Sequence, residues 1–206
     1  MSRPLLFATT NPGKLRELRE LAEGLEVLSP KDVPALPAVE ETESTLEGNA
    51  RTKALAWAKA SSFVTLADDS GLFVDALGGR PGVQSARYAQ GDDAARISQL
   101  LQEMAHVPDT ARGAAFVCAL CLAAPSGECV VETGRLEGLL TREPRGTGGF
   151  GYDPVLFLPK LGRTVAELSL AEKSRLSHRA QAFAQMRPWL VAYGRGEWPA
   201  AAAAKG

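Results

Sequence analysis

The chain has 206 residues, of which 45% are apolar and 23% charged, values typical of a globular protein with a sizeable core. The formal net charge of −1 excludes a bulk basic field for nucleic acid, so an anionic ligand must be bound by a local cluster. The longest apolar run, Gly113 to Ala124, is too short to span a bilayer, so we expect no membrane partner, and no signal peptide is expected.

Hydrophobic periodicity and turn residues predict an α/β protein with a mixed sheet, because strands and helices alternate but several strands follow one another directly. We predict one domain over residues 1–198 and a frayed tail, "WPAAAAAKG", with residues 199–206 outside the domain. In the first half of the chain, the predicted elements are a strand at 4–10, a helix at 12–23, a Pro-rich extended segment at 27–42 and a helix at 46–60. Residues 63–77 are predicted to form a strand, a tight acidic turn and a second strand, and they are followed by a glycine-rich loop at 78–91 and a helix at 92–104 capped by Asp92. In the second half, we predict strands near 113–124 and 128–140, a glycine-rich loop at 145–154, a short helix after Ser169 with a Ser169–Glu172 capping box, and a last helix at 178–190.

The cysteines number three, and an odd number argues against a disulfide framework and favours a reducing cytoplasm. Cys118 and Cys121 form a C-x-x-C pair inside the apolar segment "AAFVCALCLAA", which is predicted to be a strand. An offset of three residues puts the two thiols on opposite faces of a strand. We therefore predict that both are buried packing residues rather than metal or redox ligands.

The stretch "TTNPGK" lies where the first predicted strand becomes a helix. Asn11 is a good N-cap and Pro12 a good first helical residue, so the helix N-terminus forms an anion site to which Lys14 adds a full positive charge. It is not a Walker A loop, because Ala8 stands where that motif needs glycine. The alternative is a plain capped helix with a solvated lysine. The stretch consists of Thr9, Thr10, Asn11, Pro12, Gly13 and Lys14.

Acidic residues gather in two other stretches. "LADDSGL" places Asp68 and Asp69 next to one another, and "VEETEST" carries Glu40, Glu41 and Glu43. Adjacent carboxylates that stay ionised in a cleft need a cation, and oxygen ligands without histidine or cysteine select a hard ion such as Mg²⁺. The alternative is a polar turn of solvated acids. A phosphate-binding helix start, lysines such as Lys53 and a carboxylate pair are together the parts of a nucleotide site.

These residues resemble the inosine/xanthosine triphosphate pyrophosphatases, also called non-canonical purine NTP pyrophosphatases, over nearly the whole chain. The resemblance implies an elongated mixed sheet flanked by helices, with two lobes and a substrate cleft between them. It also implies Mg²⁺-dependent hydrolysis of ITP, dITP and XTP to the monophosphate and pyrophosphate, and a homodimer. The motifs that carry it, in order, are "TTNPGK", "EET" with "GNARTKA", "LADDSGL", "GGRPGVQSARYA", "GTGGFGYDPVLFLP" and "AELSLAEKSRLSHRAQA".

The resemblance also assigns roles to residues. Thr9 to Lys14 would hold the triphosphate, Lys53 would reach the phosphates, and Ser70 would add a hydrogen bond. Asp69 would accept a proton from the attacking water, which with Lys53 makes the catalytic set. The metal ligands would be Glu41 (or Glu40), Asp68 and Asp69.

A second group of residues, called here the base end of the site, would recognise the purine base of the nucleotide. Phe150 offers a face for stacking, and Lys173, His178 and Arg179 are donors suited to an oxygen at purine position 6. The alternative for the loop around Phe150 is an ordinary glycine-rich hairpin, and the alternative for His178 and Arg179 is the start of a surface helix without a ligand. Two cations at a helix start oppose the helix dipole, which favours a functional role for them. The residues assigned to this end are Phe150, Gly151, Tyr152, Asp153, Lys173, His178 and Arg179.

Two positions depart from the family pattern. Family members commonly have glycine after "EET" and glutamate before "NA", whereas this chain has Glu43 and Gly48. Two other functions stay open. One is a related pyrophosphatase for modified pyrimidine or methylated nucleotides, which "SHR" and "FGYD" oppose. The other is a nucleotide-binding sensor without turnover, which the Asp68–Asp69 pair opposes.

Overall fold

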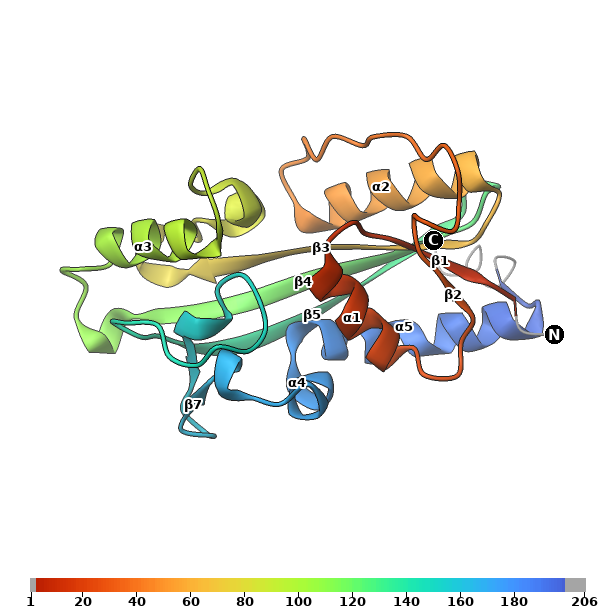
Figure 1. The fold of residues 1–206 in the computed structure, drawn as a ribbon. Coiled ribbons are helices and arrows are strands. Elements are labelled where there is room, and N and C mark those ends of the chain that lie inside the picture. Colours follow the sequence, from red (N-terminus) through yellow and green to blue (C-terminus); the bar gives the residue numbers. More distant parts are fainter. Residues whose placement is uncertain (1–2, 199–206) are drawn as a thin grey trace. The chain divides into compact units, whose positions relative to one another are not determined.

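The computed structural model describes residues 3–198, which form two compact units. Within the described residues, unit 1 comprises 3–69, 118–134 and 179–198, and unit 2 comprises 70–117 and 135–178. Each unit is therefore assembled from segments that are far apart in the sequence, as the colours in Figure 1 show. No helix in the described part of the chain has both the length and the apolar character needed to cross a membrane.

The strands form one sheet in the order β2-β1-β3-β4-β5-β6-β7. Strand β1 pairs in parallel with β2 and β3, whereas β6 pairs antiparallel with β5 and β7, so the sheet is mixed and helices flank it, as predicted. The strands are β1 Leu5–Ala8, β2 Val27–Leu28, β3 Thr65–Val74, β4 Gly113–Ala123, β5 Cys129–Leu140, β6 Leu156–Leu158 and β7 Arg163–Thr164. The helices are α1 Pro12–Leu21, α2 Leu46–Ser61, α3 Asp93–Glu103, α4 Leu170–Leu176 and α5 His178–Arg195, and 3₁₀ turns lie at Asp75–Leu77, Gly82–Arg87, Asp109–Ala111, Asp153–Val155 and Val165–Glu167.

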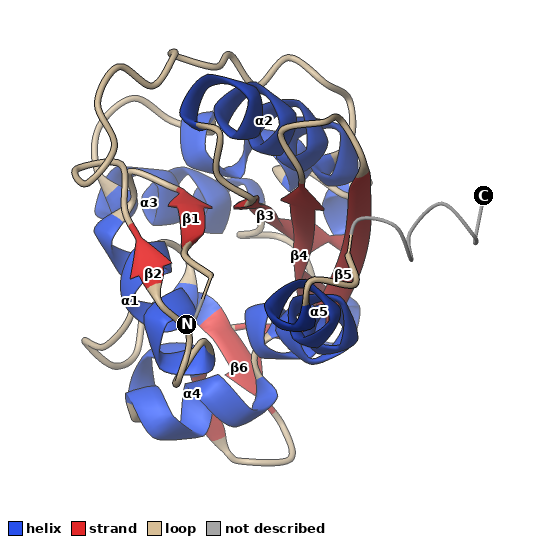
Figure 2. Cartoon of the chain, turned by 90° about the vertical axis from the view of Figure 1, so that its right-hand side faces the viewer, coloured by secondary structure: helices blue, strands red, loops and turns tan. Residues whose placement is uncertain are grey.

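Unit 1 buries the parallel strands between helices. All four residues of β1 are buried, as expected for a parallel strand that is covered on both faces. Figure 2 shows α2 and α5 on opposite sides of the strands. The core of the unit includes Phe7 on β1, Leu120 on β4, Leu18 on α1 and Met186 on α5, together with Trp198.

Unit 2 has a core of its own, which includes Leu72, Leu100, Phe116 and Leu156. Arg112, 2% exposed, ties this unit together through backbone carbonyls. Its guanidinium donates to the carbonyls of Leu140 (2.8 Å), Met104 (2.7 Å) and Thr141 (2.9 Å).

The helix caps follow the sequence signals. Asp92 accepts from the Ala95 amide at 2.9 Å, which confirms the cap of α3. Ser169 and Glu172 form the predicted capping box, in which Glu172 Oε2 accepts from the Ser169 amide at 2.8 Å. These devices satisfy helix-end amides that would otherwise lack a partner.

Two predictions about elements were wrong. The expected strand–turn–strand over 63–77 is instead one continuous strand, β3. Its polar residues stay extended because neighbouring strands and side chains satisfy them. A Cβ on Gly71 would also overlap the Gly82 carbonyl, which packs directly against the strand. The last helix runs on to Arg195, and Trp198 is buried in the core of unit 1 rather than frayed. The predicted tail at 199–206 lies outside the described residues.

Candidate active site

The junction of β1 and α1 is a capped helix N-terminus that carries the predicted phosphate-binding residues. Asn11 Oδ1 accepts from the amides of Gly13 (2.8 Å) and Lys14 (3.1 Å), so the predicted N-cap is confirmed. Thr9 Oγ1 accepts from the Asn11 amide at 3.2 Å. Thr10 is exposed and lies two residues before the first residue of α1.

Lys14 reaches from this junction to the acidic strand. Its ammonium forms an ion pair with Asp68 Oδ1 on β3. Arg179, near the start of α5, donates from Nε to Asp68 Oδ2 at 2.9 Å and pairs through Nη1 with Glu17 on α1. The side chains of Glu17, Asp68 and Arg179 are at most 5% exposed, and that of Lys14 is 15% exposed. The four formal charges of this buried quartet balance, which lowers the cost of burying them.

The charges in the quartet stabilise one another. Burial alone would raise the pKa of Asp68, but the charges of Arg179 and Lys14 outweigh burial and hold that pKa well below its ordinary value. Burial alone would lower the pKa of Lys14, but the Asp68 carboxylate raises it above its ordinary value. Both groups are therefore ionised at neutral pH.

Cys118 on β4 also contacts this carboxylate. Its thiol donates to Asp68 Oδ2, with 3.1 Å between Sγ and the oxygen, and both residues are buried. Burial and the neighbouring Asp68 charge raise the pKa of the thiol well above its ordinary value, so it stays protonated. All three cysteines are free thiols, and Cys118 and Cys121 are buried as predicted.

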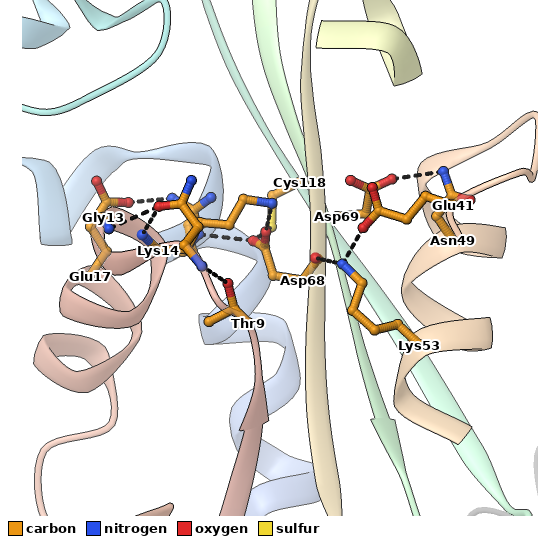
Figure 3. A network of polar contacts seen from close by, with 12 residues as sticks. Thr9, Gly13, Lys14, Glu17, Glu41, Asn49, Lys53, Asp68, Asp69 and Cys118 are labelled. Atoms are coloured by element: carbon orange, nitrogen blue, oxygen red, sulfur yellow. Dashed lines mark hydrogen bonds and ion pairs between the residues drawn. The ribbon is translucent and has the colours of Figure 1, made fainter. Parts of the chain in front are cut away.

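Asp69 points to the other side of β3. Figure 3 shows it beside Asn49, Glu41 and Lys53, with Asp68 on the opposite side of the strand. Asn49 Nδ2 donates to Asp69 Oδ2 at 3.0 Å, and Lys53 donates to the backbone carbonyl of Asp68 at 3.1 Å and pairs with Glu41. Burial, opposed by Lys14 and reinforced by Glu41, raises the pKa of Asp69 to about 6.

The opposite directions of Asp68 and Asp69 follow from the extended backbone, in which successive side chains alternate between faces. Within residues 3–198, no group of three or more His, Cys, Asp or Glu side chains is arranged to hold a metal ion unaided. Glu41 is close enough to Asp69 to affect its pKa, whereas Glu40 is exposed. Glu41 and Asp69 are therefore the acidic pair on the α2 side of the strand.

The two positions that depart from the family pattern lie against each other. A Cβ on Gly48 would stand 2.8 Å from Glu43 Cβ and 3.0 Å from its Cγ. The Glu43 amide donates to Asn49 Oδ1 at 3.0 Å, the same Asn49 that contacts Asp69. A side chain at position 48 would therefore overlap the Glu43 side chain, so the two departures are sterically linked.

In unit 2, three of the predicted base-end residues form a compact cluster. Lys173 and Asp153 are a buried ion pair, with side chains 5% and 4% exposed. Asp153 Oδ2 also accepts from the Phe150 amide at 2.9 Å, and the Lys173 ammonium lies 4.9 Å from the centre of the Phe150 ring. The cluster fixes both an aromatic face and an ammonium group.

The other predicted residues of unit 2 are placed around this cluster and β4. The Tyr152 hydroxyl donates to the Ser85 carbonyl at 2.9 Å, which makes Tyr152 a buried support rather than a contact surface. His178 stacks on Phe116 with 4.9 Å between ring centres, and Ser70 is half-buried on β3. Phe150 and Gly151 also line a pocket of about 550 Å³, together with α3 residues such as Ile97 and Leu101.

Three residues that touch the predicted site carried too little signal in the sequence. Glu17 stands three positions after Lys14 on the same helix face, but its partner Arg179 is 162 positions away, so local spacing did not indicate the pair. Asn49 lies in the quoted "GNA" motif but had no assigned role. Cys118 reads as an ordinary apolar strand residue, since its partner Asp68 is 50 positions away.

The amino-acid sequence matches one protein family over most of its length. Residues 5–189 match the model of the Ham1 family. A dITP/XTP pyrophosphatase of Halalkalibacterium halodurans is 47% identical over 189 residues, covering 90% of this chain and 97% of that protein. The dITP/XTP pyrophosphatase of Mycobacterium bovis is 49% identical over 199 residues, covering 93% of this chain and 97% of that protein.

Solved structures give the same result. A HAM1 protein from Coxiella burnetii superposes with a TM-score of 0.83 at 39% identity, covering 92% of this chain and 98% of that one. A nucleoside-triphosphatase / dITP/XTP pyrophosphatase from Mycobacterium abscessus superposes with a TM-score of 0.72 at 47% identity, covering 90% of this chain and 99% of that one.

Proposed function

Because this chain belongs to the Ham1 family, it is a nucleoside triphosphate pyrophosphatase, and we propose that its substrates are ITP, dITP and XTP. The reaction adds water across the anhydride bond between the α- and β-phosphates and yields the nucleoside monophosphate and pyrophosphate. The observation that carries the proposal is the ion pair of Lys14 with Asp68, which joins the anion site at the start of α1 to the acidic strand β3. Both parts lie in unit 1.

The triphosphate would be bound at the junction of β1 and α1. The helix dipole, the exposed Thr10 hydroxyl and the Lys14 ammonium all favour an anion there. Lys53 adds a second ammonium on the α2 side, held in place by Glu41 and by the Asp68 carbonyl. Two fixed cations favour the charge that develops on the departing pyrophosphate.

The acidic pair fits Mg²⁺. Mg²⁺ is commonly bound by one or two protein carboxylates together with substrate phosphates and water. Glu41 and Asp69 supply two such carboxylates, and the charge of Glu41 is among the causes that raise the pKa of Asp69, a repulsion that a divalent cation would relieve. When bound, the ion would neutralise phosphate charge and lower the pKa of coordinated water.

Asp69 is the proposed general base. Its pKa of about 6 lies close to neutral pH, where a base is both ionised and able to take a proton. The hydrogen bond from Asn49 fixes the direction of the carboxylate. A positioned base contributes about 10²–10⁴-fold, so the cations must supply the rest of the acceleration.

The base would be recognised by residues of unit 2. Asp153 holds Lys173 against Phe150, so the ammonium and the ring present a fixed donor beside a flat apolar face. A donor that meets the O6 of hypoxanthine or xanthine would meet the amino group of adenine instead, which cannot accept. One unmatched buried hydrogen bond costs about 1–3 kcal/mol, so rejection of ATP requires several donors together.

The test measures pyrophosphate release from ITP, XTP, dTTP, ATP and GTP, with Mg²⁺ and with EDTA. Rapid release from ITP and XTP alone, lost with EDTA, is the expected result. Release from dTTP instead would favour the related pyrophosphatase, and binding without turnover would favour the sensor. We further propose a cytoplasmic homodimer that does not bind nucleic acid, which sedimentation and a nucleic-acid titration would check.

A further inference from the structure

We propose that Asp68 is a positioning residue that holds Lys14 at the phosphate site, and that the Cys118 thiol in turn orients the Asp68 carboxylate. This inference rests on the proposed function. It assigns to Cys118 a part in substrate binding, and it gives Asp68 a different part from that of the neighbouring Asp69.

The first support is the direction of the Asp68 side chain. Asp68 points to the side of β3 that carries α1 and α5, whereas Asp69 and Glu41 lie on the side of α2 (Figure 3). Both Asp68 oxygens already contact cations of the chain: Oδ1 pairs with Lys14, and Oδ2 accepts from Arg179. A carboxylate that is already paired with two fixed cations gains little from a metal ion as a third. If the metal ion displaced Lys14 or Arg179 from Asp68, the displaced side chain would be left buried with its charge uncompensated.

The second support is what the carboxylate does to Lys14. A lysine side chain has many rotamers, and fixing one costs free energy when a ligand binds. Asp68 fixes the ammonium before any ligand arrives, because the side chain of Asp68 is fully buried on a central strand. The phosphate site is therefore preorganised, and the benefit applies to the triphosphate of every nucleotide alike.

The third support is the contact from Cys118. The thiol lies 3.1 Å from Asp68 Oδ2, is inaccessible to water and comes from the adjacent strand β4. With Arg179 it defines the plane of the carboxylate, and thereby the position of Oδ1, which contacts Lys14. A cysteine that served packing alone would have no reason to prefer a hydrogen-bonding replacement over an apolar one.

The first experiment compares Cys118→Ala, Cys118→Ser and the control Cys121→Ala. Cys121 is equally buried on the same strand and faces the other way. We expect Cys118→Ala to raise KM for ITP and for XTP by the same factor, about three- to tenfold, with a smaller change in kcat. Cys118→Ser should restore most of the loss, and Cys121→Ala should leave KM unchanged. Equal effects of Cys118→Ala and Cys121→Ala, or a Cys118→Ser variant no better than Cys118→Ala, would overturn the proposal.

The second experiment separates positioning from metal binding. Lys14→Ala, Asp68→Asn and the double variant form a cycle in which we expect the two changes to be strongly non-additive in KM. The Mg²⁺ concentration for half-maximal rate should stay the same in Cys118→Ala and rise in Glu41→Gln. A rise in Cys118→Ala would indicate that Asp68 takes part in metal binding, and additive changes in the cycle would show that Asp68 does not act through Lys14; either result would overturn the proposal.

The two proposals fail in different ways. If the wild-type protein releases no pyrophosphate from any nucleotide, the proposed function is wrong. The role of Cys118 can then still be decided by calorimetry with inorganic tripolyphosphate. Weaker binding by Cys118→Ala than by Cys118→Ser would support it, and equal binding would refute it.

Discussion

Asp69 is the residue at which we expect function and stability to oppose each other. Its side chain is buried, and burial raises its pKa from 3.8 to about 6. The folded protein therefore binds a proton more tightly than the unfolded chain does between about pH 4 and 6, and the folded state loses stability as pH rises through that window. A shift of about two units at 1.36 kcal/mol per unit sets a ceiling of about 3 kcal/mol.

The substitution Asp69→Asn removes the charge and keeps the size. At pH 7.5 without Mg²⁺, the wild-type carboxylate is ionised in both the folded and the unfolded state. Under these conditions we expect the free energy of unfolding of the variant to exceed that of the wild type by about 1–3 kcal/mol, which raises Tm by about 2–10 °C for a chain of this size. The advantage should shrink below pH 6 and vanish near pH 4.

Asp69→Asn should also release no pyrophosphate from ITP. Thermal and urea unfolding in EDTA over pH 4–8 give the measurement. Asp32→Asn is the control with the opposite sign, because hydrogen bonds from the Ser29 hydroxyl and amide lower the pKa of Asp32. Its loss of stability should appear near neutral pH and disappear as pH falls. An Asp69→Asn variant that is no more stable than wild type at pH 7.5 in EDTA would refute the reasoning.

Three further changes test other parts of the molecule. Lys14→Ala should raise KM for ITP and XTP alike by about tenfold, whereas Lys173→Gln should lower the ratio of kcat/KM for ITP to that for ATP. Steady-state kinetics give the measurement, and a changed base preference in Lys14→Ala or an unchanged one in Lys173→Gln would contradict these roles. Arg112→Met should lower the free energy of unfolding by about 3 kcal/mol or more, because buried carbonyls lose their donor; a loss under 1 kcal/mol in urea would contradict this. Gly48→Glu should destabilise the wild type, because the new side chain would overlap that of Glu43, but it should stabilise the Glu43→Gly variant, because glycine is unfavourable within a helix. We expect a coupling of about 1–3 kcal/mol in the double-mutant cycle, and additive effects would show that the two positions are independent.

Local signals predicted most of the elements and their helix caps well. Caps such as Asn11, Asp92 and Ser169 accept hydrogen bonds from amides within three residues, so a short stretch of sequence is enough to predict them. The motif order was sufficient to predict the family and the mixed sheet. The roles of the phosphate-binding residues, of the metal ligands and of the residues assigned to the purine base stay predictions.

Long-range contacts explain what sequence reasoning missed. "DDSG" has the composition of a turn, yet it lies within β3 because Lys14, Arg179 and Asn49 satisfy its carboxylates from distant segments. Once the segment is read as a strand, alternation separates Asp68 from Asp69, which no argument from adjacency could anticipate. Trp198 likewise looked like part of a tail because the core that covers it is built from other segments.

The interleaved construction of unit 1 has a consequence for synthesis. Along the sequence, its first and last segments flank residues 70–117 and 135–178, which make up unit 2. Arg179 and Trp198 leave the ribosome late, so a nascent chain carries Asp68 without its guanidinium and lacks the indole that closes the core. Chains halted before residue 179 should therefore be substrates for chaperones and proteases.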